Sequence, residues 1–139
     1  MACMVNGREI ILSGDVGDMS GWYFGEEGFS SSDVILALAQ IGNANDVTIR
    51  LNSGGGIATE GSAIHSAIAR HQGNVTIIVE GVAASAASII AMAGDDVVMS
   101  LGAVMMIHDP AGLTIGTVVD HEQQINALTA LGDAMSTIC

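Results

Sequence analysis

Residues 75–94 have the sequence VTIIVEGVAASAASIIAMAG, and this stretch decides the class of fold. Its first five residues are all β-branched, which predicts a buried strand. A glycine at position 81 then leads into small residues at 84–93, which predict a helix that ends at Gly94. A strand followed by a short turn and a helix is the building unit of α/β proteins.

The same alternation extends to both sides of this stretch. Ser31 or Ser32, followed by Asp33, predicts the start of a helix that ends before Gly42. Further helices are expected at 59–72 and from 118 onward. Strands are expected at 8–13, 46–51, 96–99 and 104–107, with another extended piece at 114–117. The order predicts one α/β domain over residues 1–139, with mostly parallel strand pairing.

The composition indicates a core built from small aliphatic side chains. Half of the 139 residues are hydrophobic, but only 3 % are aromatic. Such a core buries less area per residue than an aromatic one, so we expect stability to come partly from assembly with other copies. The loop at 14–28 contains Trp22, Tyr23 and Phe24 and is expected to pack these aromatic side chains onto a neighbour.

The charge excludes two classes of partner. Fifteen acidic residues stand against three arginines and no lysine, for a formal charge of −12, which repels nucleic acids and anionic membrane surfaces. The longest apolar stretch, 82–94, is too short to span a bilayer, and the first residues lack the order of a signal peptide. We therefore expect a soluble intracellular protein. Cys3 and Cys139 form no disulfide framework and are not expected to be catalytic.

Three segments carry polar groups at the ends of predicted strands. The glycine turn Asn52-Ser53-Gly54-Gly55-Gly56 is either a plain tight turn or one that directs backbone N–H groups at an anion. It lacks the lysine of a P-loop and does not match a dinucleotide fingerprint.

Ser85 falls in the first turn of the predicted small-residue helix. A serine there either caps the helix or gains reactivity from the helix dipole and the free N–H groups nearby. Ser88 lies one turn deeper, where we expect its hydroxyl to bond a backbone carbonyl.

His108 ends the strand expected at 104–107, just before the single proline, Pro110. It is either a structural histidine at a turn or part of a site at a strand end. His65, His71 and His121 are assigned to solvated helix faces.

Taken together, these segments resemble the ClpP family of serine peptidases. That family has N-S-P-G-G, then G-x-A-A-S, then M-I-H-x-P, each at the end of a strand. The matching segments here, in the same order and with similar spacing, are 52–56, 81–85 and 106–110. The resemblance runs from about residue 8 to the end, and residues 83–95 are most similar to the phage and prophage branch, the head maturation proteases.

The resemblance implies an activity and an assembly. Ser85 would be the nucleophile and His108 its general base, and the N–H groups of Gly56 and Ala86 would form the oxyanion hole. The implied reaction is peptide-bond hydrolysis through an acyl-enzyme, without metal or cofactor. The implied fold is the ClpP/crotonase-like spiral of ββα units. Copies would form rings of six or seven that stack, and the helix after residue 118 would be the handle that joins two rings.

The sequence departs from the family pattern at three points. The interval from Ser85 to His108 is slightly shorter than in housekeeping ClpP, which suits the phage branch. Gly54 replaces the family proline, which loosens the turn but keeps its N–H donors. The family's third catalytic residue is an aspartate after the handle helix, and Asp109, Asp120 and Asp133 do not match its place. We therefore expect that residue beyond Cys139, with the chain truncated in or just after the handle and weakly active or inactive by itself.

The branch resemblance suggests a biological setting. A phage or prophage protease of this kind would cut capsid or scaffold protein in the bacterial cytoplasm. The short N-terminus lacks an evident docking segment, so a Clp ATPase partner is not expected.

Three alternatives are weighed against this hypothesis. A Ser/Lys peptidase of the signal-peptide-peptidase type requires a lysine, and the chain has none. An acyl-CoA enzyme of the crotonase superfamily needs basic residues for the nucleotide phosphates, and only Arg8, Arg50 and Arg70 are present. The third alternative is a catalytically inactive ring subunit or scaffold.

Overall fold

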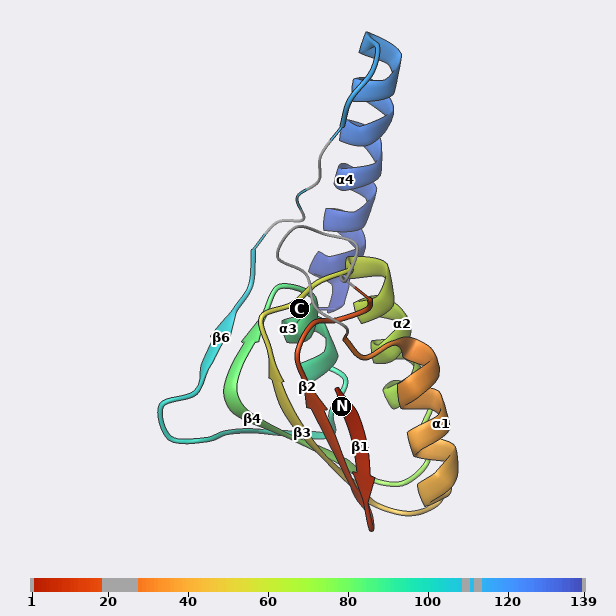
Figure 1. The fold of residues 1–139 in the computed structure, drawn as a ribbon, viewed down its shortest axis with the longest axis vertical. Coiled ribbons are helices and arrows are strands. Elements are labelled where there is room, and N and C mark those ends of the chain that lie inside the picture. Colours follow the sequence, from red (N-terminus) through yellow and green to blue (C-terminus); the bar gives the residue numbers. More distant parts are fainter. Residues whose placement is uncertain (1, 19–27, 109–110, 112–113, 139) are drawn as a thin grey trace. The chain divides into compact units, whose positions relative to one another are not determined.

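A computed structural model describes residues 2–18, 28–108, 111 and 114–138. The chain forms two compact units, residues 1–107 and residues 108–139. The first unit contains the sheet and three helices, and the second contains one long helix (Figure 1).

The sheet of the first unit is six-stranded and almost entirely parallel. Its strands are β1 (Cys3–Asn6), β2 (Glu9–Ser13), β3 (Val47–Ser53), β4 (Val75–Ala84), β5 (Asp96–Met99) and β6 (Val104–Met106). The order is β1-β2-β3-β4-β5, and β6 pairs with the second half of β4. Only the β1–β2 pair is antiparallel among the described strands. The predicted α/β class with mostly parallel pairing is therefore confirmed.

Three helices form a layer against this sheet: α1 (Ser31–Ile41), α2 (Ala58–Ala69) and α3 (Ala86–Ala91). In Figure 1, α1 and α2 lie side by side, and α2 in turn packs on α3. The strands alternate between buried and half-exposed residues, so one face of the sheet carries the core. Phe29 is the one aromatic side chain in the buried core that the structure describes, and the rest is aliphatic.

The second unit begins its helix α4 (Val118–Ile138) with a reciprocal cap. The Thr117 N–H and hydroxyl donate to the Asp120 carboxylate at 2.7 and 2.8 Å, and the Asp120 N–H donates to the Thr117 hydroxyl at 3.3 Å. The two bonds that Thr117 donates, first the one from its backbone N–H and then the one from its hydroxyl, lower the pKa of Asp120. The predicted helix from residue 118 is confirmed, and Asp120 serves to begin it.

The structure corrects several predicted boundaries. The helix cap is Ser30 rather than Ser31 or Ser32, with Asp33 completing a capping box. β4 runs five residues further than predicted, to Ala84, and α3 is correspondingly shorter. β1 was not predicted, and Thr114 to Thr117 do not form a strand. The aromatic residues Trp22, Tyr23 and Phe24 lie outside the described residues.

Candidate active site

The glycine turn follows β3, and two of its residues have backbone angles that favour glycine. Gly55 and Gly56 have φ of 104° and 154°, values that residues with a side chain rarely adopt. The Gly55 N–H donates to the hydroxyl of Ser53, which is 3 % exposed, at 3.1 Å. The buried Val16, from the segment after β2, also bonds the turn. Its N–H donates to the Gly55 carbonyl at 2.9 Å, and its carbonyl accepts the Ile57 N–H. The turn is therefore fixed from two sides.

Ser85 stands on a strained backbone between β4 and α3. Its φ and ψ are 55° and −124°, and it is the one residue other than glycine with positive φ among those the structure describes. The succession of strand, strained serine and helix resembles the backbone of a nucleophile elbow, the turn that presents a hydroxyl at the end of a sheet, and we refer to the turn at Ser85 as the elbow. Such torsion angles cost about 1–3 kcal/mol and persist only where the surroundings impose them.

The Ser85 hydroxyl is not a helix cap. It makes no capping hydrogen bond, and it has no other hydrogen-bond partner within the described part of residues 2–107. Ser88 behaves as predicted, because its buried hydroxyl donates to the Ser85 carbonyl at 2.5 Å. The two serines are thus different: Ser88 is buried and hydrogen-bonded, and Ser85 is half-exposed.

The pairing of β3 with β4 brings the two motifs together. Ser53 is opposite Ala83, two residues before Ser85. A methyl group placed on Gly55 would lie 2.7 Å from Ser85 Cβ and 3.3 Å from its Oγ, so the backbone of Gly55 lies directly against the serine side chain. On the other side, the Ser85 N–H donates to the Met106 carbonyl at 3.0 Å. The elbow is held between the glycine turn and the end of β6.

Two backbone donors in this region are unused. Neither the Gly56 N–H nor the Ala86 N–H has an acceptor within the described residues of the first unit. Ala86 is the first residue of α3, where N–H groups have no intrahelical partner. Helix α3 also packs closely on α2, since a methyl group on Gly61 would lie 3.0 Å from Ala86 Cβ. These are the two donors that the resemblance assigns to an oxyanion hole.

His108 follows β6 by two residues, is exposed, and belongs to the second unit. The other histidines differ from one another. His121 is exposed, as expected, while His65 is half-buried and burial lowers its pKa. His71 corrects the prediction of a solvated face: its Nε2 lies 2.6 Å from the Asn45 carbonyl, and its Nδ1 is buried without a partner among the described residues.

Other candidate groups play no part in this site. Burial, and then the Asp33 carboxylate, raise the pKa of the Cys3 thiol, which keeps it protonated and unreactive. Within the residues described, no cluster of three or more His, Cys, Asp or Glu is placed to bind a metal ion. Among the same residues, no helix combines the length and apolar character that crossing a membrane requires.

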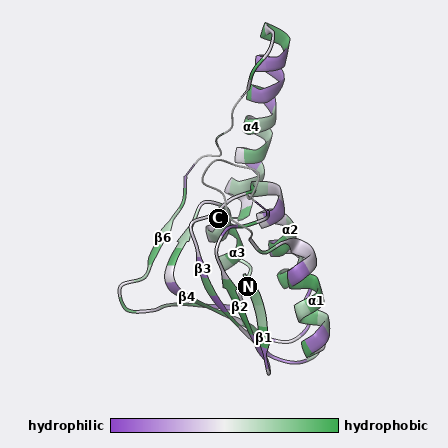
Figure 2. Ribbon diagram, viewed as in Figure 1, coloured by the Kyte–Doolittle hydropathy of each residue, from purple (hydrophilic) through white to green (hydrophobic). Residues whose placement is uncertain are grey.

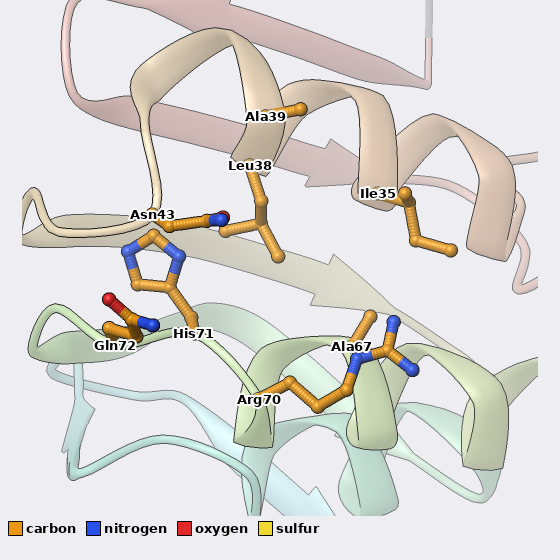
Figure 3. Close-up of a pocket in the computed structure, with 8 residues that line it drawn as sticks. All are labelled: Ile35, Leu38, Ala39, Asn43, Ala67, Arg70, His71 and Gln72. Atoms are coloured by element: carbon orange, nitrogen blue, oxygen red, sulfur yellow. The ribbon is translucent and has the colours of Figure 1, made fainter.

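The cavity in Figure 3 lies elsewhere in the first unit. It has a volume of about 360 Å³ and is lined by residues of α1, α2 and the segments after them: Ile35, Leu38, Ala39, Asn43, Ala67, Arg70, His71 and Gln72. None of the residues of the glycine turn or the elbow lines this cavity.

Comparison with a solved structure agrees with the fold. Among solved structures, a ClpP1 mutant from Listeria monocytogenes superposes with a TM-score of 0.76, covering 94 % of this chain and 69 % of that one, at 23 % identity. The first unit and the chain as a whole therefore have a mixed α/β fold of the ClpP type.

The family follows from the sequence match. The model of the Clp protease family matches residues 4–139, so the chain belongs to that family. An ATP-dependent Clp protease proteolytic subunit from Pleurastrum terricola is 32 % identical over 127 residues, covering 88 % of this chain. The chain spans 61 % of the length of that curated relative.

Sequence reasoning named Ser85, Gly56, Ala86 and His108 but missed the groups that hold them. Ser53 and Asn52 were quoted only as part of a motif, although their side chains bond the turn and the strand next to it. A polar pair at the end of a buried strand, directly before glycines, is the signal that could have indicated this role.

Proposed function

We propose that the chain carries the nucleophile and base of a serine peptidase, with Ser85 attacking the peptide carbonyl and His108 as general base. The observation that supports this most is the strained backbone of Ser85, whose hydroxyl has no structural task within the described first unit. In the proposed reaction, Ser85 Oγ loses its proton to the His108 imidazole as it bonds to the carbonyl carbon. The imidazolium then protonates the leaving amine, and water hydrolyses the acyl-enzyme.

The unused N–H groups of Gly56 and Ala86 are the proposed oxyanion donors. Donors that are fixed before the reaction stabilise the charge of the tetrahedral intermediate without reorganising. Gly56 is held by the bridge to Val16, and Ala86 by burial at the start of α3, which supports such rigidity. Removing one donor of this kind typically costs about 10²–10³ in turnover.

Chain connectivity supports the assignment of His108. Its Cα is two peptide units beyond that of Met106, a distance of at most about 7.6 Å. The Met106 carbonyl in turn accepts the Ser85 N–H. His108 thus follows, by two residues, the strand whose last carbonyl bonds the proposed nucleophile, and this order along the chain is what supports the proposal.

The third, orienting carboxylate is proposed to follow residue 139. Asp120 is engaged in the cap of α4, and Asp109 lies outside the described residues. Loss of an orienting carboxylate can lower turnover about 10⁴-fold, so residues 1–139 alone should be weakly active or inactive on peptides.

We also propose that copies of the chain assemble, as rings of six or seven. The edge of the first unit formed by β5 and β6 exposes large apolar side chains, and β6 is coloured as hydrophobic in Figure 2. They are Val97, Val98, Met99, Leu101, Val104, Met106 and Ile107. An apolar group of this size on a sheet edge is typical of an interface. Sedimentation as a monomer at all concentrations would contradict assembly.

The proposed setting is a phage or prophage protein in the bacterial cytoplasm that cuts capsid or scaffold protein without a Clp ATPase. The similarity of residues 83–95 to the head maturation branch supports it. The curated relative is named as an ATP-dependent subunit, and the competing proposal is therefore that an ATPase delivers the substrate. Cleavage of an unfolded protein by the full-length chain, with and without a Clp ATPase and ATP, distinguishes the two.

The proposed chemistry is tested with a fluorophosphonate and intact mass measurement. The expected result is one adduct per chain, which is absent in Ser85→Ala and strongly slowed in His108→Ala. Ser88→Ala should still form the adduct, because Ser88 is buried and is not the residue that is modified. An adduct that persists in Ser85→Ala would refute the assignment. No adduct in either the 139-residue or the full-length chain would favour an inactive ring subunit.

A further inference from the structure

The pairing of β3 with β4 contains a large irregularity beside the site. The register is regular as far as Leu51 opposite Val79, and it resumes with Ser53 opposite Ala83. One residue of β3, Asn52, therefore lies opposite three residues of β4, which are residues 80–82. A bulge of this size leaves backbone groups without ladder partners and allows the strand to shift.

The Asn52 side chain fills this bulge. Its Oδ1 accepts the Val82 N–H at 3.0 Å, in place of a ladder bond. The carboxamide also lies against the backbone of Gly81, because a methyl group on Gly81 would be 2.6 Å from Oδ1. The three heavy atoms nearest to such a methyl group all belong to the Asn52 side chain. Because Gly81 has no side chain, it leaves room for the Asn52 carboxamide.

The bulge determines where Ser85 stands. The residues between Val82 and Ser85 pair with β6 on one side, and Ala83 pairs with Ser53 on the other. A change in the length or conformation of the bulge would slide this segment along β3. The slide would separate Ser85 from Gly55, whose backbone now touches the serine side chain.

We infer that Asn52 is a positioning residue, whose carboxamide oxygen locks the bulge of β4 and thereby sets the Ser85 elbow against the glycine turn. This inference rests on the proposed peptidase function. Asn52 does not touch the reacting atoms, and it acts only through the position of the strand.

The test measures the fluorophosphonate labelling rate of Ser85 together with the thermal unfolding midpoint. Asn52→Leu keeps the size of the side chain but removes the acceptor, and labelling is expected to slow by about 10- to 100-fold, the cost of an ångström-scale misplacement. Asn52→Asp keeps an acceptor oxygen and should retain most of the rate. Asn74→Leu is the matched control, because Asn74 makes exposed side-chain bonds to Thr76 and Asp96 near the start of β4.

A second variant keeps the test decisive if Asn52→Leu folds poorly. Gly81→Ala puts a methyl group into the space of the carboxamide, at a position where the backbone does not require glycine, and it should also slow labelling. In the double variant Asn52→Ala/Gly81→Ala that clash is gone, so Gly81→Ala should have no further effect. This non-additivity is a property that a general loss of stability would not produce.

Labelling of Asn52→Leu and Gly81→Ala at the rate of the unmodified chain would overturn the inference while leaving the peptidase proposal intact. Slowing by the same factor in Asn74→Leu would also overturn it. Absence of labelling in the unmodified full-length chain would instead refute the proposed function, and the role of Asn52 with it.

Discussion

The two halves of β4 lie in one strand but have different geometries. Residues 75–79 keep a regular register with β3 on one side and β5 on the other. Residues 80–84 bulge away from that register, change partner from β5 to β6, and lead into the strained Ser85. The regular half buries Val75, Ile77 and Val79 in the core, and the irregular half positions a hydroxyl. The large buried side chains of β4 therefore lie in its regular half, and the residues that lead into Ser85 lie in its irregular half.

The largest effect on the irregular half is expected from a substitution in the glycine turn that faces it. Gly55→Ala would place a methyl group 2.7 Å from both the Ala84 carbonyl and Ser85 Cβ, at a φ of 104°. We expect fluorophosphonate labelling of Ser85 to fall about 100-fold or more, because the serine must move. Gly54→Ala is the matched control, since a methyl group there would have no atom within 4 Å. Equal labelling rates in the two variants would show that the turn does not set the position of Ser85.

The regular half should respond in stability and not in chemistry. Ile77 is fully buried, so Ile77→Ala is expected to lower the free energy of unfolding by about 2–5 kcal/mol. The labelling rate per folded molecule should stay near that of the unmodified chain, because the bulge separates Ile77 from the elbow. Chemical denaturation and labelling at a temperature where both proteins are folded provide the two measurements. A tenfold loss of labelling without unfolding would remove the distinction between the halves.

The smallest expected effect is a pH dependence of folding stability that leaves the labelling of Ser85 unchanged. Burial lowers the pKa of His65 on α2 below its ordinary value of about 6.5. The unfolded chain then binds more protons than the folded chain below about pH 6.5, so stability should decline as the pH falls through that value towards the folded pKa. His65→Gln should weaken this decline, measured as the unfolding midpoint between about pH 5 and 8. The pH dependence of Ser85 labelling should not change, and a change would place His65 in the site.

The regular half of β4 could be predicted from sequence, and the irregular half could not. Residues 75–79 are β-branched and apolar, so local preference and tertiary burial indicate the same strand. Residues 80–84 contain a glycine and small residues that locally favour a turn and a helix, and they extend only because Asn52 and β6 bond them. The strand was therefore predicted five residues too short.

The candidate site shows the same limit. Ser85, Gly56 and Ala86 were named because their motif resembles that of a family, and the structure adds the strained φ and the unused donors. The hydrogen bond from Gly55 to Ser53 joins residues two apart and could in principle be predicted from the sequence. The bond from Val82 to Asn52 joins residues thirty apart, and no local pattern indicates it.

The backbone of Ser85 has one more consequence, and it concerns the history of the chain. Glycine can adopt a φ of 55° with a ψ of −124° at little steric cost, whereas serine cannot. Selection for folding alone would therefore favour glycine at this position, which a change of a single residue would supply. Folding stability alone therefore does not account for the serine at this position.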